Sequence, residues 1–170
     1  MKRGLDQIID GGEAGNKLVM DVVADEEMVN VVKGDNTFKA EGSARIVSWK
    51  PNDQYGGLDV NGSTARPAFI ALAHELAHAH DAVIDNKMDF TTWFNYGGKS
   101  VPNSEKYATH WENKVRSENG ISLRAYYTET VYKDAAILNR DNTSMFYKRL
   151  YETSVEPQKF SRMRPLPYEY

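Results

Sequence analysis

The chain has 170 residues, of which 41% are hydrophobic and 26% charged, proportions that suit one compact globular domain with a sizeable core. Its net charge of −3 gives no support for a nucleic-acid partner, and no apolar run is long enough to span a membrane. The absence of cysteine excludes disulfides and thiolate metal sites. Any bound metal must therefore be held by histidine, aspartate or glutamate.

The first 50 residues are expected to be mainly β. Segments 17–25, 28–34 and 44–51 are rich in valine and isoleucine and are separated by turns of Asp, Gly and Asn. This pattern favours two or three strands in a small, antiparallel-rich sheet. A loop rich in Gly, Asn and Asp follows at 51–62.

A helix is predicted over residues 66–84, because start signals precede apolar residues that recur at helical spacing. This helix contains the pattern HExxH, with His74, Glu75 and His78. Two histidines four residues apart share one helix face and can bind one zinc ion together. The glutamate between them can take a proton from a zinc-bound water. The alternative is a pair of solvated or hydrogen-bonded histidines.

A second helix is predicted over residues 103–119, ending before Gly120 as its C′ glycine. Residues 131–170 are a tyrosine-rich tail without an assignment. No repeat or low-complexity linker divides the chain, so we expect a single α+β domain over residues 1–170.

A catalytic zinc needs a third protein ligand, and Glu112 on the second helix is the predicted one. His80 points about 200° away from His78 around the first helix, so it cannot bind the same zinc ion. His110 points about 160° away from Glu112 on the second helix, so these two residues cannot both bind one ion. The alternative for Glu112 is an ion pair with Arg116, one turn further on. Asp81 is a candidate for orienting a ligand imidazole.

Peptide hydrolysis also needs groups that stabilise the oxyanion formed on the attacked carbonyl. Arg124 and Tyr127 follow the second helix and could lie beside the zinc. The alternative is that they are surface and packing residues.

Two segments together resemble the NleD-like bacterial effector zinc peptidases, which are compact relatives of the clostridial neurotoxin light chains. The segments are GLDVNGSTARPAFIALAHELAHAHD and HWENKVRSENGISLRAYY. The family pattern joins an Arg-Pro-Pro lead-in and HExxH to a downstream ENxxRxExGxxxRxxY segment. Ala68 stands where the second proline of the lead-in is usual. The resemblance covers roughly residues 50–130.

The resemblance implies a minimal zincin-like fold, with a small twisted sheet beside the active-site helix and a second, ligand-bearing helix. It implies zinc ligands His74, His78 and Glu112, a general base Glu75, and an R-x-x-Y pair, Arg124 and Tyr127, at the oxyanion. Two further acidic residues are expected to hold helices or ligand rings in place: Asp81 and Glu118.

The sequence thus predicts a zinc-dependent endopeptidase that acts as an effector or toxin on a protein of a target cell. The N-terminus lacks the apolar stretch of a signal peptide, so delivery to the target-cell cytoplasm by a dedicated secretion system is expected. Similar domains form the C-terminal toxin tips of Rhs-like polymorphic proteins, which leaves a larger carrier and a cognate inhibitor open. The alternatives are a metallohydrolase acting on a non-protein amide such as peptidoglycan, and a non-catalytic binding module stapled by zinc. Substrate, cleavage site, target organism and oligomeric state are not readable from the sequence.

Overall fold

The structure is a computed structural model that describes residues 2–26, 28–41, 44–85, 88–153 and 162–170. The helices are α1 (Lys2–Asp10), α2 (Glu13–Ala24), α3 (Ala68–His80) and α4 (Ser104–Glu118). The strands are β1 (Val29–Lys33), β2 (Thr37–Glu41), β3 (Ala44–Trp49), β4 (Thr92–Tyr96), β5 (Lys99–Pro102), β6 (Lys148–Thr153) and β7 (Arg162–Pro167). The expected α+β class is confirmed, because three small sheets, antiparallel in all but one pairing, accompany four helices.

The β prediction is wrong for the start of the chain. Residues 17–24, expected as a strand, belong to α2, and α1 precedes it. Leu18, Val19 and Val22 are buried on one side of α2, which is a helical spacing. The backbone NH of Ala14, in the first turn, donates to the Glu118 carboxylate at 2.7 Å. This cap comes from 104 residues away, so local β propensity was overridden by a tertiary contact.

The three-stranded sheet has the order β1-β3-β2, with β1 parallel and β2 antiparallel to the central β3. β1 and β3 match the predicted strands at 28–34 and 44–51, whereas β2 was not predicted. Val47 and Trp49 of β3 are buried against the helices. The Trp49 indole NH donates to the carbonyl of Ala68 at 2.8 Å, which ties β3 to the first residue of α3.

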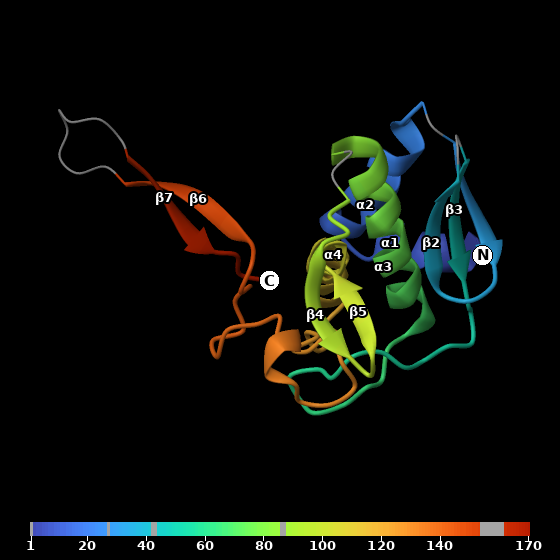
Figure 1. Cartoon of the computed structure of the whole chain (residues 1–170). Coiled ribbons are helices and arrows are strands. Elements are labelled where there is room, and N and C mark those ends of the chain that lie inside the picture. The colour runs from blue at the N-terminus through green and yellow to red at the C-terminus, as the bar shows by residue number, and fades with distance from the viewer. Residues whose placement is uncertain (1, 27, 42–43, 86–87, 154–161) are drawn as a thin grey trace.

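Helices α3 and α4 lie side by side at the centre of the molecule, between the three-stranded sheet and the C-terminal segments (Figure 1). The predicted helix over 66–84 is α3 followed by a π-helical turn, Asp81–Asp85. The predicted helix over 103–119 is α4, and Gly120 has the positive φ of 64° expected of a C′ glycine. Every residue of α3 from Ile70 to His80 is buried, so the histidines lie in the interior.

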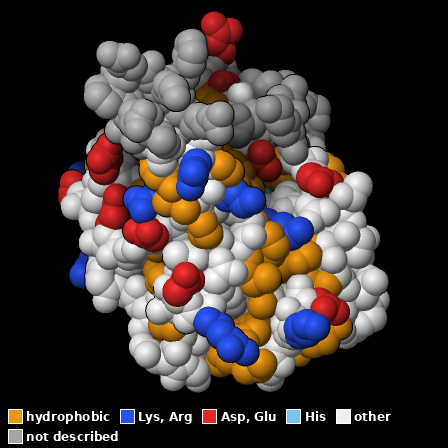
Figure 2. Space-filling view, turned by 90° about the vertical axis from the view of Figure 1, so that its left-hand side faces the viewer, with side chains coloured by type: hydrophobic (Ala, Val, Ile, Leu, Met, Phe, Trp, Pro, Cys, Tyr) orange, Lys and Arg blue, Asp and Glu red, His pale blue; other side chains and the backbone are white. Residues whose placement is uncertain are grey.

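The segment between the two predicted helices contains the β4–β5 hairpin, and the unassigned tail contains the β6–β7 hairpin. The second hairpin extends away from the helices as an arm (Figure 1). The side of the molecule on which this arm lies shows hydrophobic side chains beside lysine and arginine side chains (Figure 2). Within the described residues, no helix is both long and apolar enough to cross a bilayer.

Candidate metal centre

The HExxH residues lie on α3, where the helix passes between the sheet and α4. His74, Glu75 and His78 are all buried. The imidazole rings of the two histidines are 5.1 Å apart and nearly perpendicular. Phe38 of β2 stacks on the outer side of His78, with ring centroids 6.5 Å apart. The sheet therefore contacts the His78 ring directly, and the two imidazole rings pack against each other.

Glu105, in the first turn of α4, faces the two histidines. Its Oε2 lies 3.0 Å from Nε2 of His74 and 3.4 Å from Nε2 of His78. In a tetrahedral site with ligand bonds of about 2.0–2.1 Å, the ligand atoms are about 3.3 Å apart. Two imidazole nitrogens and one carboxylate oxygen thus lie within 4.8 Å of one another, close enough to share one metal ion. The three residues fit a metal ion.

Glu112 lies on the opposite side of the His74 ring. Its Oε2 is 3.0 Å from Nδ1 of His74, whereas Nε2 of the same ring faces Glu105. A carboxylate bonded to Nδ1 fixes the ring orientation and tautomer of a histidine that binds metal through Nε2. The structure thus brings Glu112 next to the site, but it is Glu105 whose carboxylate joins His74 and His78 in one group.

Two arginines surround the buried Glu112 carboxylate. Arg116 Nε donates to Oε1 at 2.9 Å, and Arg124 Nη1 donates to Oε2 at 2.8 Å. Burial favours the neutral form of Glu112, but Arg124, Arg116 and His74 outweigh it and hold its pKa well below the usual value. The ion pair expected as the alternative for Glu112 is therefore formed, together with a second one.

His74 stands between two carboxylates. Burial opposes a charge on its ring, but the hydrogen bonds and charges of Glu105 and Glu112 outweigh burial and raise its pKa to about 9. Such an arrangement needs positive charge at the Nε2 side, which a proton or a metal ion can supply. The electrostatics agree with the spacing in favouring a cation here.

The segment after α4 is anchored to α4 and to the loop before α3. Asn113 holds the backbone of Arg124, accepting from its NH at 2.8 Å and donating to its carbonyl at 3.0 Å. Gly57 packs so tightly that a Cβ there would collide with Arg124 Nε and the carbonyls of Tyr126 and Tyr127. Only glycine allows the loop to approach the R-x-x-Y segment this closely.

Arg124 and Tyr127, the predicted oxyanion pair, line the same cleft as His74 and Glu75. The Arg124 guanidinium uses its remaining donors on the carbonyls of Tyr126, at 3.2 Å, and Tyr127, at 2.6 Å. Its Cζ lies 4.7 Å from the centre of the Tyr127 ring. Burial and the nearby Glu105 raise the pKa of Tyr127, so its hydroxyl remains a proton donor at neutral pH.

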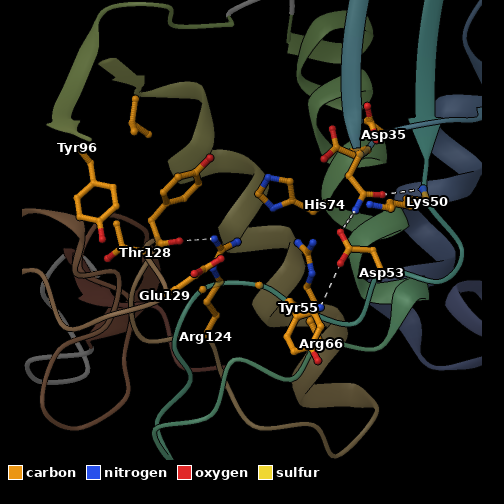
Figure 3. A pocket seen from close by; sticks show the side chains of 16 residues that line it. Asp35, Lys50, Asp53, Tyr55, Arg66, His74, Tyr96, Arg124, Thr128 and Glu129 are labelled. Atoms are coloured by element: carbon orange, nitrogen blue, oxygen red, sulfur yellow. Dashed lines mark hydrogen bonds between the residues drawn. The ribbon is translucent and has the colours of Figure 1, made fainter. Parts of the chain in front are cut away.

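A cleft of about 580 Å³ opens onto this centre and is lined by His74, Glu75, Arg124 and Tyr127 together with the loop around residues 53–57 (Figure 3). Burial raises the pKa of Glu75, although His74 and His78 oppose the shift. A carboxylate with a raised pKa at the base of a cleft is suited to accept a proton and return it.

The two remaining predicted residues lie further from the metal centre. Glu118 accepts from the backbone NH groups of Ala14, at 2.7 Å, and Gly15, at 3.3 Å, and so holds α2 on α4. Asp81 is buried at the C-terminal end of α3. Nδ1 of His78 has no hydrogen-bond partner in the part of the chain that the structure describes, so Asp81 does not orient that ring.

Sequence reasoning did not identify Glu105, Asn113 or Arg66 as site residues. Glu105 lies seven positions before Glu112, which places both carboxylates on one face of α4. That two-turn spacing was the available signal, but it does not say which of the two is nearer to the Nε2 atoms. Arg66 and Asn113 belong to the lead-in and to the downstream pattern quoted above, but their roles depend on contacts between distant segments, which the patterns do not show.

Comparison with known proteins matches residues 5–127 to the family model Peptidase M91, which carries the description "effector protein". The matched range begins within α1 and contains α2 to α4, the three-stranded sheet, the β4–β5 hairpin and the segment that ends at Tyr127. The β6–β7 arm lies beyond it. No curated protein and no solved structure matches the chain.

Proposed function

Because the chain belongs to the Peptidase M91 family of effector proteins, we propose that it is a zinc-dependent endopeptidase that cleaves a protein of a target cell. The observation that carries the proposal is the convergence of His74, His78 and Glu105 beside Glu75 in one cleft. Bound zinc would polarise the scissile carbonyl and lower the pKa of water.

The chain's own residues then have distinct tasks. His74, His78 and Glu105 would hold the ion, in place of the set with Glu112 expected from the sequence. Glu112 would orient His74 through its Nδ1. Glu75 would take a proton from the attacking water and deliver it to the amine that leaves.

Tyr127 would donate its phenolic proton in a hydrogen bond to the oxyanion that forms on the scissile carbonyl. Arg124 holds the backbone carbonyl of Tyr127 and lies over its ring. It would thereby position the phenol and add positive potential to the same side of the cleft.

A free strand edge favours a peptide over a sugar-linked amide as substrate. β2 pairs with β3 on one side only, within the described strands. Residues 36–38 of this edge line a second cavity, of about 260 Å³, together with His74, Glu75, His78, Glu105 and Tyr127. An extended peptide could pair with β2 through main-chain hydrogen bonds and thereby pass over the histidines.

The family description also supports delivery into another cell, and we propose that a dedicated secretion system carries the chain to the target-cell cytoplasm. A larger carrier and a cognate inhibitor in the producing cell are parts of the same proposal.

The test compares the zinc-loaded chain with Glu75→Gln in a proteomic scan for new N-termini in a host-cell lysate. Glu75→Gln is expected to bind zinc and fold normally but to lose nearly all cleavage, because the carboxamide cannot accept the proton. Glu13→Gln, an exposed change of the same type, is the matched control. Cleavage by Glu75→Gln at the parent rate would refute the proposed base. Hydrolysis of purified cell wall, without new N-termini in the lysate, would instead favour peptidoglycan as the substrate.

A further inference from the structure

Arg66 is a buried cation at the metal cleft, and none of the described residues accepts a hydrogen bond from its side chain or forms an ion pair with it. Only 9% of its surface is exposed. Its Nε has no hydrogen-bond partner, and its guanidinium takes part in no ion pair, among the residues that the structure describes. Figure 3 shows the side chain rising beside Asp53 toward His74. Burying an arginine without an acceptor is costly, so this one is arranged for a group that arrives with the substrate.

The backbone around Arg66 holds the side chain in this position. The NH of Arg66 donates to the carbonyl of Gln54 at 2.7 Å, and the NH of Gly56 donates to the carbonyl of Thr64 at 2.9 Å. A Cβ on Gly56 would lie 2.9 Å from Cδ of Arg66 and 3.0 Å from its Nε. The glycine therefore leaves room for the arginine stem along the cleft wall, and the guanidinium is oriented in advance.

Glu75 lies near enough for the positive charge of Arg66 to oppose the rise of its pKa, but the two side chains form no ion pair among the described contacts. The other acidic residues of the cleft do not compete for this guanidinium. Asp35 and Glu129 are exposed, so water screens their charges. Asp53 accepts from the Asn36 side-chain amide at 2.8 Å and from the NH of Tyr55 at 3.4 Å. The second arginine of the cleft, Arg124, is already paired with Glu112. Arg66 is thus the one buried cation among the described cleft residues that is open to an incoming anion.

We propose that Arg66 is a specificity residue that binds the carboxylate of an aspartate or glutamate side chain close to the scissile bond. This inference rests on the proposed peptidase function. A guanidinium presents paired NH donors that match the two oxygens of a carboxylate, and the low exposure strengthens the pair. Peptides with an acidic residue at one fixed position should therefore be preferred over their amide counterparts.

Binding can be measured without any cleavage. The probes are N-acetyl-glutamyl amide and N-acetyl-glutaminyl amide, added to the zinc-loaded chain while the Arg66 Nε–Hε NMR signal is followed. The acidic probe is expected to bind about tenfold more tightly, since one charged hydrogen-bonded pair is worth that much. Arg66→Gln should abolish the difference, and a carboxylate bound to the metal instead would retain it.

The matched control is Arg140→Gln, which removes the same charge from an exposed position outside the cleft. Gly56→Ala is the second variant, and thermal unfolding checks that each variant folds. The added methyl group should displace the Arg66 stem and weaken the acidic preference without changing any charge. Equal binding of the two probes to the parent chain, or an unchanged preference in Arg66→Gln, would overturn the inference whatever the peptidase activity.

Cleavage of a tryptic peptide library provides the second readout. The parent chain should show aspartate and glutamate enriched at one position beside the cleaved bond. Arg66→Gln should lose that enrichment, measured as the ratio of cleavage at acidic and at neutral sites in the same digest. An equal loss of rate on acidic and neutral sites would mean that Arg66 acts on the main chain, contrary to the proposal. If the parent chain cleaves no peptide, the peptidase proposal fails and the probe titration still decides the role of Arg66.

Discussion

Glu105 and Glu112 stand two turns apart on α4, and the His74 ring lies between their carboxylates. The surroundings of the two carboxylates differ in charge. Glu112 is fully enclosed and bonded to Arg116 and Arg124, whereas Glu105 faces two imidazoles and the cleft. A carboxylate neutralised by two guanidinium groups is a poorer metal ligand than one whose partners are imidazoles, because an imidazole can give up its proton when a metal ion binds.

The two glutamates should therefore respond in opposite ways to the same substitution. Glu105→Gln is expected to lose stoichiometric zinc but to remain folded. Glu112→Gln is expected to retain zinc with an affinity about 10–100-fold lower, because the orientation of His74 is weakened. It should also lose about 3–5 kcal/mol of stability, since the two arginines are left buried without a counter-charge. Chelator competition and denaturant unfolding measure the two effects. If Glu112→Gln lost its zinc while Glu105→Gln retained it, the result would support the ligand set predicted from the sequence instead.

At the scale of helices and strands, the sequence predicted what was carried by local periodicity. The bounds of α4 agree within a residue, and β1 and β3 lie where valine and isoleucine cluster. The prediction was wrong for α2 because its valine-rich composition resembles that of a strand. The helix is also held at its amino-terminal end by a carboxylate from α4, which local sequence does not reveal. The sequence pattern does not separate Glu112, the predicted ligand, from Glu105, which the structure groups with the two histidines, because helix phase places both on one face of α4.

The contact between Glu118 and the first turn of α2 has a measurable consequence. Glu118→Gln keeps the shape of the side chain but removes the negative charge at a helix N-terminus. The expected loss of stability is about 1 kcal/mol, from the weaker cap and the lost interaction with the helix dipole. Zinc affinity should stay unchanged, because the cap lies far from the cleft. Urea unfolding and zinc titration of the same sample test this, and a change in zinc affinity would contradict it.

For the whole molecule, acid stability should depend on His110, where the end of the chain packs on α4. The ring stacks on Tyr147 with centroids 4.1 Å apart, and its Nδ1 lies 2.8 Å from the hydroxyl of Tyr170. Burial and the nearby Lys114 lower the pKa of His110 to about 3. The unfolded chain, with a pKa of about 6.5, therefore binds a proton that the folded chain does not. This contribution to the free energy of unfolding is fully present above the pKa of the unfolded chain and is lost as the pH falls toward 3.

His110→Phe should remove this part of the pH dependence. Between pH 7.5 and pH 5.0, the free energy of unfolding of the parent should fall by about 2 kcal/mol more than that of the variant. The variant should be less stable at pH 7.5 by about 1 kcal/mol, because the bond to the Tyr170 hydroxyl is lost. Urea unfolding at the two pH values measures both quantities. Parallel pH dependences would show that the ring is protonated in the folded state.

The β6–β7 arm should be dispensable for the fold and for the metal centre. Each of its strands has its main contacts with the other, and the arm lies beyond the range matched to the family. Its two ends already meet, since the NH of Tyr168 donates to the carbonyl of Tyr147 at 2.9 Å. Residues 148–167 can therefore be replaced by Asn-Gly, which closes a tight hairpin without moving either end.

The shortened chain keeps Tyr147, Tyr168 and Tyr170, and with them the packing around His110. Its thermal midpoint should lie within about 4 °C of the parent, because less than about 1 kcal/mol of packing is removed. Stoichiometric zinc should be retained. A two-stranded hairpin is marginally stable by itself, so an arm of this kind is expected to gain its stability from a partner rather than lend it to the domain. A large drop in the midpoint, or loss of zinc, would instead make the arm part of the domain that carries the site.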